Sequence, residues 1–346
     1  LGLVVWQHDD RDYPSGWAGG SIARQNRNLA RWEVTLASSQ RYSGPGEILL
    51  DVGSLVPPRQ RLLSVAAFGP DERIEDLTDR LSGNQLKWSV PQGNWEIFVV
   101  AVWQPGIDDP GTHPDHKHGQ ERGYIDPLSE EATDLYVETI LGATFRRLGQ
   151  EFGRTWRGFF IDEPGFLSSG SRLGTSGVGY PYTPDLLERF QRRFSYSLRP
   201  LLPLLWLSRG KLTARVRHDY MEFVTSEYGR LFVGKLTRFA EEHGTQLIGH
   251  LIEGLPMAIE YGVGRGTGST LRTLEHFSMG GFDNIFDQWY EPDEDVYWRQ
   301  PKIASSVSHY METPLDEAMV EHFAATGWRT GLTEMKAMVD WTTCRG

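Results

Sequence analysis

The chain has 346 residues, and its 46 acidic against 35 basic side chains give a formal net charge of −11. This length fits one large domain, or one domain that carries an insert. The acidic balance argues against a nucleic-acid partner, because phosphate binding needs clustered Lys and Arg. No apolar run approaches the roughly 20 residues of a membrane-spanning helix. The single cysteine, Cys344, excludes an internal disulfide and a multi-cysteine metal site.

The sequence pattern of the N-terminal third changes near residue 33, from a strand, loop and helix to short strands separated by turns. Residues 1–6 form a short apolar run with β-branched residues, which predicts a buried strand. A glycine-rich loop follows, and residues 21–32 are predicted to form a helix. Residues 1–32 are therefore expected to begin a barrel, and 33–105 to form a small inserted antiparallel β domain of strands and turns. Its predicted strands are 47–52, 62–68, 85–90 and 95–103.

The remainder, 106–346, alternates helices with strands after a long polar loop, which indicates a parallel sheet. Polar residues gather at the carboxyl ends of these strands, as in a (β/α) TIM-type barrel. A doubly wound sheet is the alternative, weakened because no glycine-rich phosphate loop follows a strand. The predicted helices are 129–151, 184–195, 211–243 and 332–341, and the predicted strands are 158–161, 245–250, 281–286, 302–307 and 318–323.

The strongest chemical pattern is the segment 158–166, in which small and apolar residues run into Asp162 and Glu163 before Pro164 and Gly165. Burying two carboxylates at a strand end costs several kcal/mol unless they are paired or functional. The pattern predicts a general acid or a metal ligand, and an exposed pair of turn acids is the alternative.

Three further groups follow predicted strands. Asp9 and Asp10 close the first strand, His250 and Glu253 follow the strand 245–250, and Glu321 interrupts the last apolar run. The non-functional alternatives are ordinary turn acids for Asp9 and Asp10, a structural histidine for His250, and an acid on a helix face for Glu321.

Glycoside hydrolysis needs such a set of carboxyl groups. One carboxylic acid protonates the leaving oxygen, and a second carboxylate acts as base or nucleophile. Apolar walls such as Phe159, Phe160 and Phe166 would raise the pKa of the acid. Further carboxylates would hold sugar hydroxyls or a hard cation such as calcium. The aromatic content of 12% fits a sugar-binding protein, although a large core explains it equally well.

Two other hydrolase chemistries have weaker support. His113, His116 and His118, with Asp115, would serve a metal-dependent hydrolase, but their spacing matches no established zinc pattern and solvated loop histidines explain them. No Gly-x-Ser-x-Gly elbow supports a serine hydrolase.

Seven groups of residues, in order along nearly the whole chain, are similar to one family. Together they identify a resemblance to bacterial α-L-rhamnosidases of glycoside hydrolase family 106. The groups are Val5-Trp6-Gln7-His8-Asp9-Asp10 with Tyr13–Gly20, Trp88–Pro91 with Gly93–Trp95, Gly123–Ala132, Phe160–Pro164, Arg272–Phe277 with Gly280–Asp283, Lys302–His309, and Gly327-Trp328 with Met335-Lys336 and Asp340-Trp341.

The resemblance implies a barrel with a small β insert, hydrolysis of a glycosidic bond with inversion, calcium near the site and no organic cofactor. We expect Glu163 as general acid and Glu321 as base, with roles that could be exchanged. An oligosaccharide or plant-type glycan is the expected substrate, with no nucleic acid or membrane partner. Relatives are often secreted or periplasmic, but no signal peptide is visible here. The expected substrate- or cation-binding residues are Asp9, Asp10, Asp162, His250 and Glu253, with Trp17 and His309 as further substrate-binding residues.

Three positions depart from the family pattern. Asp10 replaces a glutamate, Val320 precedes Glu321 where the family has serine, and Gly280 replaces a proline. The changes at Asp10 and Val320 support an alternative, a catalytically degenerate relative that binds carbohydrate without turnover.

The length bounds the barrel. The insert takes about 75 residues and leaves roughly 270, against about 250 for a typical barrel. Only about six barrel strands are recognisable between Leu1 and Phe323, and the resemblance places one strand before Leu1 and one after Gly346. We therefore expect a TIM-type barrel that is incomplete at both ends, an open arc with the carboxylates on its C-terminal face.

Overall fold

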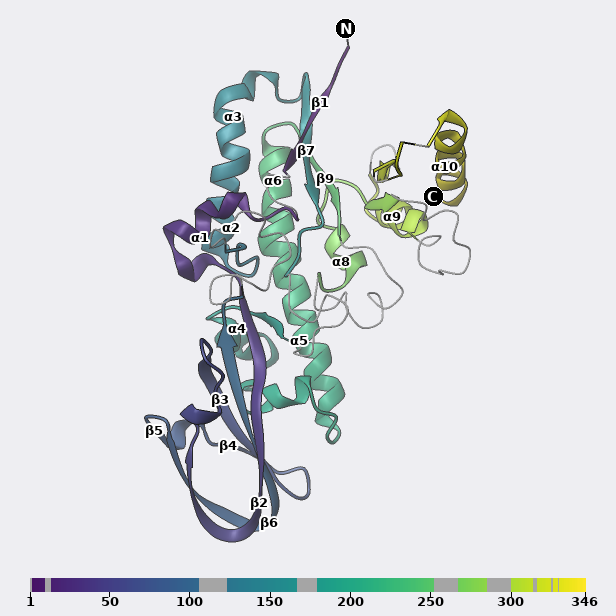
Figure 1. The fold of residues 1–346 in the computed structure, drawn as a ribbon. Coiled ribbons are helices and arrows are strands. Elements are labelled where there is room, and N and C mark those ends of the chain that lie inside the picture. Colours follow the sequence, from purple (N-terminus) through teal and green to yellow (C-terminus); the bar gives the residue numbers. More distant parts are fainter. Residues whose placement is uncertain are drawn as a thin grey trace.

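A computed structural model describes most of the chain and shows an antiparallel sheet beside a region of parallel strands and helices (Figure 1). The described residues are 2–9, 14–105, 123–166, 179–251, 267–284, 300–313, 316–324, 326–328 and 330–346.

The largest sheet is antiparallel and has six strands in the described part of the chain, in the order β4-β3-β6-β2-β8 with β5 paired to β6. Its centre is the long pair β2 and β6, at the lower end of the view in Figure 1. The strands are β2 (Trp32–Asp51), β3 (Arg61–Phe68), β4 (Ile74–Asp76), β5 (Leu81–Ser82), β6 (Gln85–Trp103) and β8 (Tyr180–Tyr182).

The apolar run 95–103 is explained by burial on both faces of this sheet. Ile97 and Val99 face one hydrophobic core, whereas Phe98 and Val100 face the other. Successive side chains of a strand point to opposite faces, so a strand covered on both sides reads as continuously hydrophobic.

The sheet curls where β2 and β6 shift register between Gly44 and Gly46. A Cβ atom on Gly44 would lie 2.0 Å from the carbonyl oxygen of Pro91, so only glycine fits this close approach. The curl brings Trp88 against Trp95, whose rings meet edge to face at 5.3 Å. One core is thereby enclosed by the sheet itself.

The parallel strands form two small sheets. One has the order β1-β7-β9, with β1 at its edge, and the other pairs β10 with β11. Leu3 and Val4, which lead into β1, are 72% and 56% exposed. The bounds are β1 (Val5–Asp9), β7 (Trp156–Asp162), β9 (Gln246–His250), β10 (Gly281–Asn284) and β11 (Met319–His322).

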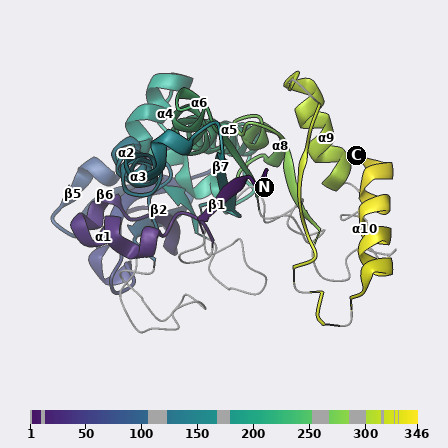
Figure 2. The same cartoon turned by 90° about the horizontal axis from the view of Figure 1, so that it is seen from above.

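Helices cover the parallel strands and connect them (Figure 2). Phe159, Ile161 and Leu247 belong to the same core as Tyr136 and Phe232 from these helices. No helix in the described segments has both the length and the apolarity that a bilayer crossing requires. The helices are α1 (Ser21–Gln25), α2 (Glu130–Val137), α3 (Ala143–Leu148), α4 (Leu186–Phe194), α5 (Leu212–Tyr228), α6 (Gly234–Glu242), α8 (Thr270–Leu274), α9 (Gln300–Tyr310) and α10 (Leu332–Arg345).

The expectation of a TIM-type barrel is wrong. The described parallel strands number three and two in separate sheets, and the largest sheet is antiparallel, so the eight-fold alternation of a barrel is not present in this part of the chain. The break between β9 and β10 has a local cause. Ser278 donates its N–H to Leu247 O and accepts from Leu247 N, and so occupies backbone groups that a neighbouring strand would use.

One predicted strand is a helix. Residues 302–307 lie in α9, although Ile303, Ser305 and Val307 alternate as in a strand. Pro301 stands at the start of α9, where its missing N–H costs no hydrogen bond. Ala304, Val307 and Ser308 are buried at helical spacing, so tertiary packing decides the conformation.

Candidate functional site

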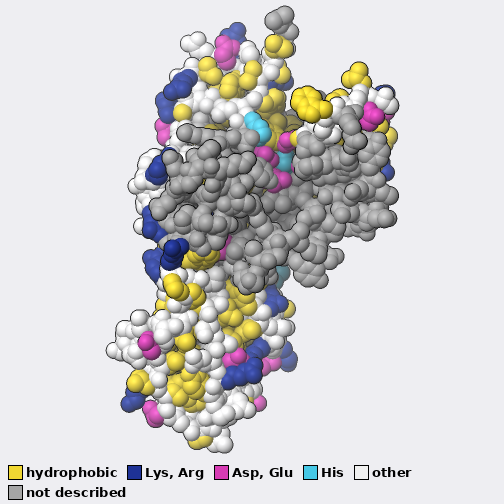
Figure 3. Space-filling model, in the orientation of Figure 1, with side chains coloured by type: hydrophobic (Ala, Val, Ile, Leu, Met, Phe, Trp, Pro, Cys, Tyr) yellow, Lys and Arg dark blue, Asp and Glu magenta, His cyan; other side chains and the backbone are white. Residues whose placement is uncertain are grey.

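The carboxyl ends of the parallel strands carry a group of polar side chains. In the register of the sheet, His8 lies opposite Phe160 and Asp162 lies opposite His250. Because side chains alternate along a strand, these four residues share one face, while Ile161 points into the helical core. Figure 3 shows acidic and histidine side chains gathered beside β7 and β9.

His250 is the centre of this strand-end cluster. Its Nε2 lies 3.0 Å from Glu321 Oε2 and 3.3 Å from Asp162 Oδ1. The imidazole is 1% exposed, whereas the two carboxylates are 28% and 15% exposed. His8 Nε2 approaches the other oxygen of Asp162 at 3.7 Å. Side chains from β1, β7, β9 and β11 therefore gather around Asp162 and the buried imidazole of His250.

The two carboxylates beside His250 have opposite pKa shifts. Burial raises the pKa of Asp162 to about 6, against the opposing effect of His250. The hydrogen bond from His250 holds the pKa of Glu321 below its usual value. Carboxyl groups whose environments separate their pKa values are the usual basis for assigning an acid and a base.

Glu163 and Asp283 extend the cluster. One carboxylate oxygen of Glu163, one of Asp283 and a nitrogen of His250 lie within 4.8 Å of one another. A second such group is formed by Asp162, His250 and Glu321, whose ligand atoms also lie within 4.8 Å of one another. Either group has the size and donor types of a cation site. Glu163 has a φ of 42°, in the left-handed region that costs a non-glycine residue about 1–3 kcal/mol.

Three expected substrate-binding residues make their contacts outside the strand-end cluster. Asp9 faces away from Asp162, because it pairs with Ile161 in the register, and it accepts a hydrogen bond from Tyr136. Trp17 is buried against Tyr124, with ring centroids 5.2 Å apart. His309 lies on the exposed side of α9, with Nδ1 3.2 Å from Asp316 Oδ2.

The remaining expected residues lie outside the described residues. They are Asp10, Glu253, His113, Asp115, His116 and His118.

Asp283 and His8 join the cluster although neither was singled out as a site residue. Both follow the pattern that identified Asp162, a polar side chain at the carboxyl end of an apolar strand. What the sequence lacked was the pairing of β10 with β11, which sets Asp283 opposite Glu321.

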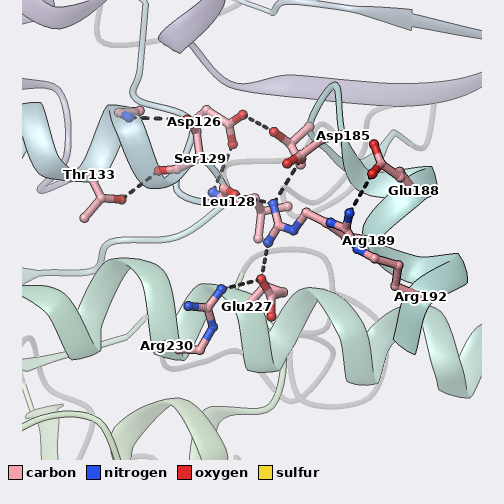
Figure 4. A network of polar contacts seen from close by, with 12 residues as sticks. Asp126, Leu128, Ser129, Thr133, Asp185, Glu188, Arg189, Arg192, Glu227 and Arg230 are labelled. Carbon is pink, nitrogen blue, oxygen red and sulfur yellow. Dashed lines mark hydrogen bonds and ion pairs between the residues drawn. The ribbon is translucent and has the colours of Figure 1, made fainter. Parts of the chain in front are cut away.

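A second polar cluster joins α2, α4 and α5 (Figure 4). Arg189 pairs with Asp185 and Glu227 and donates to Leu128 O at 3.0 Å. The cluster borders a pocket of about 830 Å³. Arg189 neutralises Asp185 and Glu227, and its contacts connect α4 with α5 and with the segment that leads into α2.

Comparisons with known proteins identify a family. Residues 59–261, more than half of the chain, match the model of glycoside hydrolase family 106, described as alpha-L-rhamnosidase. Among solved structures, the rhamnosidase from Novosphingobium sp. PP1Y is similar, with a TM-score of 0.56 and 20% identity. The match covers 86% of this chain and 26% of that one, so this chain spans about a quarter of that rhamnosidase and shares its fold there. No curated protein matches.

Proposed function

Because the chain belongs to glycoside hydrolase family 106, whose model is described as alpha-L-rhamnosidase, we propose that it hydrolyses α-L-rhamnosides at the strand-end cluster. The observation that carries the proposal is the contact of buried His250 with carboxylates from two different strands, Asp162 and Glu321. Glycosidic hydrolysis requires an acid and a base at one site, and Glu163 and Glu321 each have an oxygen within 4.8 Å of a nitrogen of the same His250.

The proposed reaction assigns one proton transfer to each of two glutamates. Glu163 donates a proton to the glycosidic oxygen as the bond to the anomeric carbon breaks. Glu321 accepts a proton from the water that attacks the opposite face of the sugar, so the product has inverted configuration. His250 favours the ionised form of Glu321, because its hydrogen bond stabilises the carboxylate.

Asp162 would bind the substrate. Its oxygens face His8 and His250, and its pKa of about 6 leaves a fraction protonated near neutral pH. The ionised carboxylate can accept hydrogen bonds from sugar hydroxyls, and the protonated carboxyl group can also donate one.

The decisive experiment compares the parent with Glu163→Gln and Glu321→Gln on an aryl α-L-rhamnoside and a panel of other glycosides. Each substitution is expected to lower kcat by at least about 100-fold, since general acid–base catalysis contributes this much. Glu188→Gln, which alters an exposed carboxylate paired with Arg192, is the control. Parental rates in both variants would show the assignment to be wrong.

The same material distinguishes the alternative. A parent that binds rhamnose-containing glycans but releases no sugar from any of them would be a carbohydrate-binding relative. Proton NMR of the first anomer released tests inversion, which the retained anomer would contradict.

Calcium is part of the proposal. Carboxylate oxygens are the ligands that calcium prefers, and Asp162 and Asp283 each belong to one of the two residue groups that could hold a cation. A cation there would offset the charge of neighbouring carboxylates and orient sugar hydroxyls. Activity should fall in chelator and return with added calcium, and full activity after exhaustive chelation would remove calcium from the site.

A further inference from the structure

We propose that Ser15 and Tyr124 are positioning residues that hold the backbone around Glu163 in its left-handed conformation. The inference rests on the proposed role of Glu163 as the general acid. The two residues form a clamp on the segment 162–166, and both are almost completely buried.

Ser15 holds the start of this segment through both its backbone and its side chain. The Ser15 N–H donates to Asp162 O at 2.8 Å, and the Asp162 N–H donates to Ser15 Oγ at 2.8 Å. The Ser15 hydroxyl in turn donates to Asp9 O at 2.5 Å. Ser15 thus joins the ends of β1 and β7 one residue before Glu163.

Tyr124 holds the segment on the other side of Glu163. Its Oη accepts the Gly165 N–H at 3.2 Å and donates to Ser15 O at 2.7 Å. The ring lies against Gly16, where an added Cβ would come within 2.4 Å of Tyr124 Oη and where φ is +120°. Glycine at position 16 is therefore required for Tyr124 to reach both groups.

A third contact holds the far end of the segment. Arg31 Nη1 lies 3.5 Å from Phe166 O, and the Arg31 N–H donates to Tyr124 O at 2.9 Å. Pro164 has no N–H of its own to anchor. Backbone bonds on both sides of Glu163 therefore set its φ of 42°, as expected where a strained residue is held by its surroundings.

The clamp explains how the carboxylate of Glu163 comes to lie within 4.8 Å of Asp283 and His250. Without it, Glu163 would relax to negative φ, and its side chain would leave the direction set by the end of β7. A displacement of about 1 Å can reduce turnover about 100-fold.

The test compares Tyr124→Phe with Tyr180→Phe. The Tyr180 hydroxyl is also buried and donates to a backbone carbonyl outside the strand-end cluster, Leu205 O at 2.8 Å. On an aryl α-L-rhamnoside, Tyr124→Phe should lower kcat by about 10- to 100-fold with KM within about threefold. Tyr180→Phe should leave kcat within about threefold of the parent. Equal kcat values in the two variants would overturn the proposal.

A double-mutant cycle separates positioning from general destabilisation. In a Glu163→Gln background, Tyr124→Phe should cause no further loss of kcat, because the clamp acts only through Glu163. A full additional loss would overturn the proposal. If Glu163→Gln itself leaves kcat unchanged, the proposed role of Glu163 fails instead.

Crystal structures of Tyr124→Phe and Ser15→Ala give a readout that needs no turnover. In either variant that folds, Glu163 should move to negative φ and its carboxylate away from His250. Retention of a φ near 42° in both variants would overturn the clamp. Ser15→Thr, which keeps the hydroxyl, should restore the parental conformation where Ser15→Ala loses it.

Discussion

Burial sets the charge state of single carboxyl groups in this protein. Asp126 is 1% exposed, accepts hydrogen bonds from Thr183 Oγ1 at 2.7 Å and Leu128 N at 3.0 Å, and has a pKa raised to about 7, chiefly by burial. The pKa of Asp162, in the strand-end cluster, is raised to about 6 for the same reason. In contrast, the pKa of Glu321 is lowered because His250 donates a hydrogen bond to its carboxylate.

Asp126→Asn should flatten the pH dependence of stability. The folded state binds the Asp126 proton more tightly than the unfolded state, whose pKa is near 3.8. Its contribution to the free energy of unfolding is therefore full below about pH 4 and is lost as pH rises through about 7. Urea titrations at pH 5 and pH 8 should show a drop for the parent of up to a few kcal/mol and a smaller drop for the variant. Glu188→Gln, at an exposed carboxylate that pairs with Arg192, is the control. Equal drops in parent and Asp126→Asn would contradict this origin.

His250→Gln should move the acidic limb of the pH–rate profile to higher pH. Glu321 must be ionised to act as a base, and its pKa rises when the hydrogen bond and charge of His250 are weakened. The measurement is kcat/KM as a function of pH, with His218→Gln, an exposed histidine on α5, as control. An unmoved limb would mean that Glu321 is not the titrating base.

At the scale of elements, local patterns predicted β7, β9 and β11 but not how they associate. The strand 158–161 and the strand 245–250 were recognised from short apolar runs, and both are confirmed as β7 and β9. Residues 302–307 were predicted as a strand and form part of α9, because Ile303 and Val307 are β-branched yet, four residues apart, also fit one side of a helix. Contacts across long sequence separations, such as His250 with Glu321, depend on packing that no local pattern encodes.

Gly281→Ala should separate β10 from β9. An added Cβ would lie 1.9 Å from Gly249 O, so the strands must move apart, at a cost of typically 1–3 kcal/mol. Because β10 carries Asp283 and pairs with β11, kcat/KM should fall together with the melting temperature. Gly46→Ala, in β2 with nothing within 4 Å of its added Cβ, is the matched control. Equal melting temperatures in the two variants would contradict the close approach.

At the scale of the whole molecule, β6 couples two hydrophobic cores. Trp95 and Ile97 line the core inside the curled sheet, while Phe98 and Val100 line the core shared with the helices. The aromatic content is consistent with a large core, but the division into two cores depends on the curl of the sheet at Gly44. That curl rests on a register shift and not on any periodicity of the sequence.

Trp95→Ala and Phe98→Ala should each lower the free energy of unfolding by about 3–5 kcal/mol within one cooperative transition. A strand that serves both cores cannot unfold from one and remain in the other. Guanidinium titrations followed by tryptophan fluorescence and by far-ultraviolet circular dichroism should coincide. Separate transitions in Trp95→Ala would show that the cores are independent.

The edge position of β1 has a consequence for handling this 346-residue chain by itself in solution. The residues that lead into β1, Leu3 and Val4, are apolar and largely exposed, and β7 is the one strand that pairs with β1 among the described residues. An apolar edge of this kind is a template for strand addition by another chain. Self-association should therefore begin here as concentration rises, and a lysine in place of Val4 should raise the concentration at which turbidity appears. An unchanged concentration for the onset of turbidity would show that self-association begins at another surface.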